Sequence, residues 1–261
     1  MGVLNFFRIS FLVIFSIILF AALIIGGTFW TVSYSLNYNN VETHAFPIVK
    51  QAIEKQMNIT EMSQNFEQVK SYCQLNPDYV YNDENGMFSI SCQEVMSGTS
   101  ETIIDSKIKD NIKKVYYTQY TCTFFECFKT ETKGPFFLIS EMSQKTFAKF
   151  FYYSLIALII IILIMFFLTA DKRNLMIILG SLFIIASLPF MKLTSIITPD
   201  RINAGEFKEY VSEFLLIFLG KATTIFWIML VLGLILLIAG IILRVLQIWE
   251  KQEPARKKKS K

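Results

Sequence analysis

The sequence predicts an all-α multi-pass membrane protein with four transmembrane helices and a small α+β extracytoplasmic domain inserted between helices 1 and 2. Its 261 residues are 53% hydrophobic and only 18% charged, whereas soluble domains carry roughly 25% charged residues. The charges avoid four long stretches, Ile9–Val41, Phe150–Ala170, Asn174–Met191 and Ala222–Leu243. A bilayer core about 30 Å thick requires about 20 apolar helical residues. Each stretch reaches or nearly reaches that length.

The first apolar stretch resembles a secretory signal peptide, because Arg8 precedes an apolar core at Phe11–Ile25. However, the apolar run continues to Trp30, and no A-x-A cleavage pattern follows it. A retained helix is therefore the favoured interpretation, and a cleaved signal is the alternative.

The second and third stretches are separated only by Asp171–Asn174, which predicts an antiparallel hairpin of two spans. The fourth span is expected to begin near Thr224, with Lys221 among the lipid headgroups. Before it, residues 204–219 are expected to form an interfacial amphipathic helix or an outward extension of the span. Small residues in the spans, Ala22, Gly26, Gly233 and Gly240, predict close helix packing. We favour packing within one chain, and dimerisation is the alternative.

The predicted organisation has five parts. These are a cytoplasmic N-terminus with helix 1 (1–34), the extracytoplasmic α+β domain (35–146), the transmembrane hairpin (147–198), an outer loop with the interfacial helix (199–221), and helix 4 with a basic cytoplasmic tail (222–261). The orientation rests on the basic residues Lys172 and Arg173 between the second and third spans and on the basic tail. Such residues flank spans on the cytoplasmic side. We therefore expect a cell-membrane protein with both termini cytoplasmic.

All four cysteines, Cys73, Cys92, Cys122 and Cys127, lie in the domain assigned to the outside. An even number of cysteines in an exported domain predicts two disulfides. Three pairings are possible, and we favour Cys73 with Cys92 and Cys122 with Cys127, because each closes a local loop. Free thiols and a four-cysteine zinc site are the less favoured alternatives.

Within the domain, helices are expected at about 46–57, 60–73 and 101–119, the last with an apolar stripe of Ile104, Ile108, Ile112 and Val115. Val69 is expected on a common apolar face with Phe66 and Cys73. Residues 79–95 are expected to form a β-hairpin around Asn85-Gly86.

Aromatic side chains gather between Tyr116 and Phe137 in numbers that exceed those of a solvated loop. They are interpreted either as the core of the domain around Cys122 and Cys127 or as a surface that rests on the membrane or on a partner protein. The sequence alone does not distinguish between these two interpretations.

Asn58-Ile59-Thr60 is an N-x-[ST] sequon, so Asn58 is a possible glycosylation site. The tail residues Arg256, Lys257, Lys258, Lys259 and Lys261 are expected to contact lipid headgroups. Alternatively, the tail serves only to determine topology. Nucleic-acid binding is not expected of so short a segment.

Sequence motifs for catalysis are absent. The single histidine, His44, cannot form a two-histidine metal site, and no P-loop, G-x-G-x-x-G or H-E-x-x-H motif occurs. We therefore expect no catalytic, cofactor-binding or metal-binding residues, and we interpret His44 as a polar surface residue.

Four spans with cysteines in the first loop are also the layout of claudins, but the tryptophans and cysteine spacing of that family are absent. The sequence therefore indicates no family. The leading hypothesis is a non-enzymatic envelope protein, an accessory, receptor-like or structural subunit that contacts lipid and binds a protein partner, a surface polymer or a signal, or forms a homo-oligomer. The alternatives are a subunit of a transporter or channel and, third, a membrane-embedded enzyme.

Overall fold

The computed structural model describes residues 3–56, 59–77, 80–82, 89–129, 135–169, 172–196 and 208–259. The chain divides into two compact units. One unit, termed the bundle, comprises Met1–Ser35, Lys145–Ile202 and Phe218–Lys261. The other unit, termed the inserted domain, comprises Leu36–Gln144 and Asn203–Ile217. Each unit is described by itself.

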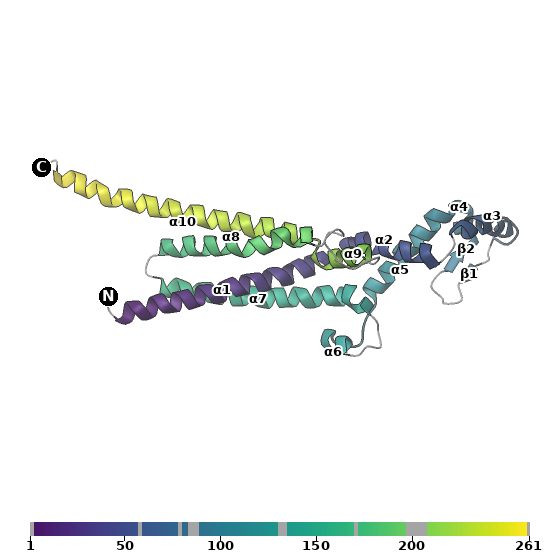
Figure 1. Cartoon of the computed structure of the whole chain (residues 1–261), viewed down its shortest axis with the longest axis horizontal. Helices are drawn as coiled ribbons and strands as arrows, with labels where there is room; N and C mark the ends of the chain where they lie inside the picture. The colour runs from purple at the N-terminus through teal and green to yellow at the C-terminus, as the bar shows by residue number, and fades with distance from the viewer. Residues whose placement is uncertain are drawn as a thin grey trace. The chain divides into compact units, whose positions relative to one another are not determined.

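The bundle is built from four long helices, α1 (Val3–Ser35), α7 (Glu141–Leu168), α8 (Lys172–Ile196) and α10 (Ala222–Lys259), which run alongside one another (Figure 1). Four segments of the described chain are long and apolar enough to cross a membrane, namely Phe7–Ser35, Glu141–Leu168, Lys172–Leu193 and Val211–Leu246. The prediction of four helices that are apolar and long enough to span a membrane is thereby confirmed.

The core of the bundle draws side chains from all four helices. Its buried residues are Leu19, Leu23, Met165, Leu175, Leu179, Ala186, Phe190, Ile225, Phe226 and Met229. Aromatic contacts join α1 to α7, with ring centroids 5.4 Å apart for Phe29 and Phe150 and 5.1 Å apart for Trp30 and Phe151. Few residues of α7 are buried, and Phe167 is 77% exposed. Such an apolar exterior suits a lipid environment and would be unfavourable in water.

Helices α8 and α10 approach closely because glycines face each other at their contact. A Cβ atom added to Gly180 would lie 2.6 Å from the backbone nitrogen of Leu237 and 2.7 Å from the carbonyl oxygen of Gly233. Gly240 faces Ile177 of α8, and Gly26 of α1 faces Ser154 of α7. The small residues singled out in the sequence at positions 26, 233 and 240 therefore pack within one chain.

The inserted domain is almost entirely helical. Its elements are α2 (Tyr38–Gln56), α3 (Ile59–Leu75), β1 (Val80–Asn82), β2 (Ser89–Ser91), α4 (Cys92–Ser97), α5 (Ser100–Tyr117), α6 (Phe124–Lys129), the 3-10 helix η2 (Pro135–Ile139) and most of α9 (Lys208–Leu219). The strands pair antiparallel over only three residues each, with Val80 opposite Ser91. The predicted α+β class is therefore not supported for this domain.

The expected second strand ends early because a helix signal follows Ser91. The Ser91 hydroxyl accepts a hydrogen bond from the backbone N–H of Glu94, and the Glu94 carboxylate accepts one from the backbone N–H of Ser91. This reciprocal capping box starts a helix at Cys92. Residues 92–95, which were expected to continue the hairpin, are helical instead.

Two helices differ from expectation in detail. The first begins at Tyr38 and not near Phe46, because the side-chain oxygen of Asn37 accepts a hydrogen bond from the backbone N–H of Asn40 and so caps an earlier start. Pro47 consequently lies inside α2. In α5 the buried stripe is Ile103, Ile108, Ile112 and Tyr116, so Ile103 and Tyr116 replace the expected Ile104 and Val115.

The glycine contact between α8 and α10 leads to a stability prediction. We expect Gly180→Ala to force the two backbones apart and to lower the free energy of unfolding by roughly 1–3 kcal/mol, as overpacking does elsewhere. Thermal unfolding of the purified protein in detergent measures the effect. The control is Ile185→Ala, which trims an exposed side chain of the same helix and should change the midpoint little. Equal midpoints for both variants would contradict the close α8–α10 contact.

Candidate functional site

Two disulfides are formed in the inserted domain. One joins Cys73 of α3 to Cys92 of α4 with a Cα–Cα distance of 5.1 Å, and the other joins Cys122 to Cys127 with 5.5 Å. The pairing agrees with the one favoured from the sequence. Because every cysteine is engaged in a disulfide, no thiolate is left for the alternative zinc site.

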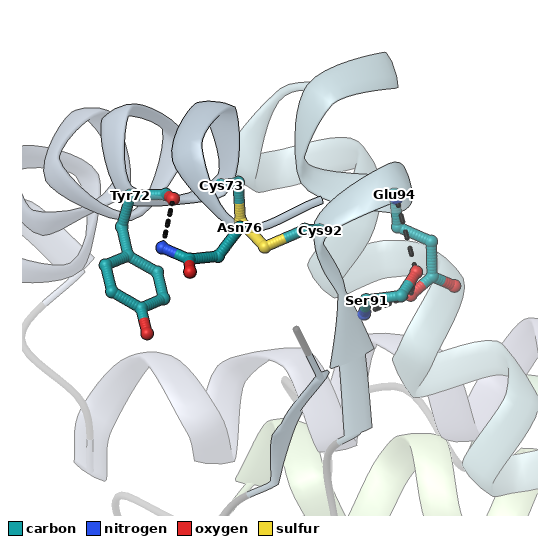
Figure 2. The surroundings of a disulfide bond; sticks show 6 residues. All are labelled: Tyr72, Cys73, Asn76, Ser91, Cys92 and Glu94. Atoms are coloured by element: carbon teal, nitrogen blue, oxygen red, sulfur yellow. Dashed lines mark hydrogen bonds between the residues drawn. A yellow bond between two sulfur atoms is a disulfide. The ribbon is translucent and has the colours of Figure 1, made fainter. Parts of the chain in front are cut away.

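The first disulfide lies in a small buried cluster that holds α3 against α4 (Figure 2). Cys73 and Cys92 are each 2% exposed, and Val95 and Phe66 pack against them. Beyond the cluster, Lys107 of α5 donates a hydrogen bond of 2.8 Å to Glu94. This bond, followed by the bond from Ser91, lowers the pKa of the Glu94 carboxyl group. The disulfide and the charged pair therefore hold α3, α4 and α5 in one arrangement.

Large apolar side chains remain exposed beside this disulfide. On α3, Val69, Tyr72 and Leu75 recur every three residues and so lie along one side of the helix, and α4 contributes Met96. Leu75 is 83% exposed, and the other three are each more than 40% exposed. We term these four residues the α3–α4 surface.

Sequence reasoning missed this surface. Val69 was expected on a common apolar face with Phe66 and Cys73. In the structure Val69 is 41% exposed, whereas Cys73 is buried. The spacing of Val69, Tyr72 and Leu75 could have indicated this surface. Together with Phe66 and Cys73, these residues make the apolar face of α3 wider than the part that packs in the buried cluster.

A polar contact between α2 and α9 was also missed. The Nδ1 atom of His44 lies 2.9 Å from Oε2 of Glu213, and both side chains are partly buried. The side-chain amide of Asn40 donates to the carbonyl oxygens of Leu216 and Ile217, at 3.5 and 3.4 Å. His44 is therefore a structural partner of α9 and not an isolated surface residue.

The aromatic residues between Tyr116 and Phe137 divide between the two interpretations. Tyr116 and Phe137 are buried, and the Tyr116 hydroxyl lies 2.9 Å from both the carbonyl oxygen of Leu36 and the side-chain oxygen of Gln144. Burial raises the pKa of Tyr116 to about 12, so the hydroxyl keeps the proton that it donates. Phe125, Phe128 and Phe136 are instead exposed.

The remaining site residues predicted from the sequence lie wholly or partly outside the described part of the chain. Asn58 is one of them. The backbone of Arg256, Lys257, Lys258 and Lys259 belongs to α10, but their side chains, and Lys261 entirely, are outside the described part. Within the described residues, no group of three or more His, Cys, Asp or Glu side chains could hold a metal ion. No protein-family model, curated protein or solved structure matches the chain.

The two disulfides should contribute unequally to stability. Chain entropy assigns about 3 kcal/mol to a bridge with the sequence separation of 19 found for Cys73–Cys92. The same relation assigns about 2 kcal/mol to the separation of 5 for Cys122–Cys127. We expect the double variant Cys73→Ser/Cys92→Ser to expose α3 and α4 to protease at lower temperature than Cys122→Ser/Cys127→Ser. Limited proteolysis across a temperature series measures this difference, and the opposite order of sensitivity would contradict the prediction.

Proposed function

We propose that the chain is a non-enzymatic accessory or receptor-like subunit of the cell membrane, whose inserted domain binds a protein partner through the α3–α4 surface. The observation that carries the proposal is the exposure of Val69, Tyr72, Leu75 and Met96 on a framework that a disulfide and a capping box hold in place. Exposed apolar clusters of this kind characterise protein interaction sites.

The composition of the surface supports a protein partner. Tyrosine and methionine are enriched at interface centres, and a tyrosine can anchor in a pocket while its hydroxyl finds a polar partner. Methionine adapts its shape to irregular apolar surfaces. Because the backbone beneath is already ordered by the Cys73–Cys92 bridge, little further ordering is needed on binding.

We further propose that the inserted domain is extracytoplasmic and that both termini are cytoplasmic. The basic residues Lys172 and Arg173 at the start of α8 support this orientation. The paired cysteines support it as well, because disulfides persist in oxidising compartments.

The orientation predicts the reactivity of two engineered cysteines. The native cysteines are all paired, so a membrane-impermeant maleimide applied to intact cells should label only an introduced thiol. We expect labelling of Lys113→Cys, at an exposed position of α5, and none of Ser260→Cys in the tail until the cells are opened. The reverse pattern would show that the domain faces the cytoplasm.

The partner-binding proposal predicts site-specific crosslinking. A photoreactive amino acid at position 75 should crosslink in cells to one reproducible protein, which mass spectrometry identifies. The same amino acid at position 113 is the matched control, because Lys113 is exposed on α5 outside the α3–α4 surface. Substitution of Met96 by Asp should lower the yield of the adduct at position 75 several-fold, since a charge at the contact must lose its hydration.

Three outcomes would change the proposal. Equal yields at positions 75 and 113 would exclude a specific site on α3. An adduct with only a second copy of the chain would replace the foreign partner with a homo-oligomer. Ion or solute flux by the purified protein in liposomes would instead favour a transporter or channel.

A further inference from the structure

The segment around the second disulfide forms a small, well-supported aromatic loop, which comprises residues 122–129 with η2. Its helix α6 starts at a reciprocal pair, in which the carboxylate of Glu126 accepts a 2.8 Å hydrogen bond from the backbone N–H of Thr123 and the Thr123 hydroxyl accepts one from the backbone N–H of Glu126. The Cys122–Cys127 bridge closes the loop across that helix. The shape of residues 122–127 is therefore fixed by the disulfide and by the capping pair.

The loop has a buried base. The side chain of Phe137 is 5% exposed, and the rings of Phe124 and Phe128 contact it at centroid distances of 5.8 and 6.4 Å. The hydroxyls of Ser140 and Ser143 both donate 2.6 Å hydrogen bonds to the carbonyl oxygen of Phe137. The aromatic loop is thus fastened to the first turn of α7.

Three phenylalanines of the loop are exposed, although one of them, Phe128, also contacts Phe137. Phe125, Phe128 and Phe136 are 60%, 64% and 57% exposed. Phenylalanine has no polar group that benefits from water, and three such rings on one short, closed loop form an unusual concentration of exposed apolar area. A core does not require them, because Phe137 and Tyr116 already fill that role.

The loop lies close to the start of a membrane span along the chain. Tyr116, which precedes the loop, is hydrogen-bonded to Gln144, and η2, which ends the loop, is hydrogen-bonded to Ser143. Helix α7 continues without a break to Leu168. Counting about 20 residues back from Leu168 places the hydrocarbon boundary near Lys149. Gln144 then lies only about 8 Å beyond that boundary along the helix axis, at the depth of the lipid headgroups.

We propose that this disulfide-closed aromatic loop inserts Phe125 and Phe128 into the interfacial region of the bilayer, with Phe136 beside them. The occupant of the exposed aromatic surface is lipid and not a protein partner. Helix α7, which follows the loop along the chain, also carries exposed aromatic side chains, since Tyr152 and Tyr153 are more than 60% exposed. Aromatic rings partition to the membrane–water interface, and apolar side chains anchor peripheral segments there.

The loop would act as a second attachment of the inserted domain to the membrane, beside the covalent connections to α1 and α7. A domain attached in this way has fewer orientations available than one held only by its connecting chain segments. This inference does not depend on the orientation of the protein in the membrane or on the identity of any partner of the α3–α4 surface.

Photolabelling in pure lipid tests the inference. The full chain, purified and reconstituted into phosphatidylcholine liposomes, would carry a diazirine amino acid at position 125 or 128. After illumination, mass spectrometry measures the fraction of the protein that carries a lipid adduct. Position 167 is the positive control, because Phe167 lies exposed on α7. Position 75 is the negative control, because Leu75 is even more exposed than the loop phenylalanines but belongs to the α3–α4 surface.

We expect lipid adducts at positions 125 and 128 to approach the yield at position 167 and to exceed the yield at position 75 several-fold. Yields no higher than at position 75 would overturn the inference, as would adducts only with a second copy of the chain. A second readout uses Phe125→Ser/Phe128→Ser with the diazirine at position 136, where the lipid adduct should fall several-fold. An unchanged yield at position 136 would show that the two rings do not hold the loop in the interface.

Discussion

The absence of water in a bilayer core is the constraint on which the rest of this structure depends. A backbone group that lacks a hydrogen-bond partner there costs several kcal/mol, so the chain can cross only as unbroken helices. Helices α1, α7, α8 and α10 each contain an unbroken apolar stretch that is long enough to cross. Because lipid tails are as apolar as leucine, burying apolar surface does not by itself bring helices together in a membrane. The helices must instead fit closely.

That requirement explains the unequal packing of the bundle. At Gly180 and Gly233 the backbones of α8 and α10 touch, since no side chain intervenes. Helix α7 has a different composition. Its long run of isoleucine, leucine and phenylalanine contains few small residues, and few of its side chains are buried. Helices α8 and α10 therefore fit together through their close backbone approach. Helix α7 is joined to α1 by aromatic contacts and by the contact between Gly26 and Ser154.

The parts of the fold that the sequence predicts well are those set by one dominant physical effect. Charge-free length determines the spans, and the spacing of Cys73, Cys92, Cys122 and Cys127 favours the pairing that the structure shows. The α+β prediction was wrong because two local signals compete near Ser91. Alternation favours a strand there, but the capping box with Glu94 favours a helix and prevails. The start of α2 was missed for a similar reason, since the cap at Asn37 outweighs the preference of Pro47 for a first turn.

The functional surfaces were harder to predict, because exposure is a tertiary property. Apolar spacing on α3 shows that Tyr72 neighbours both Val69 and Leu75. It does not show which side of the helix the Cys73–Cys92 bridge draws inward. The same limit applies to the aromatic segment, where Phe137 is buried and Phe136 beside it is exposed. The exposures of these two neighbouring phenylalanines differ because the hydroxyls of Ser140 and Ser143 hold the Phe137 carbonyl and so set the rotation of η2.

The two exposed surfaces also differ in chemistry. The α3–α4 surface carries aliphatic, thioether and phenol groups on ordered helices, which suit a contact with a protein of complementary shape. The aromatic loop carries phenylalanine rings, which can insert into the apolar part of a bilayer without such a complementary surface. The two proposals therefore assign a protein partner and lipid to different residues of the inserted domain.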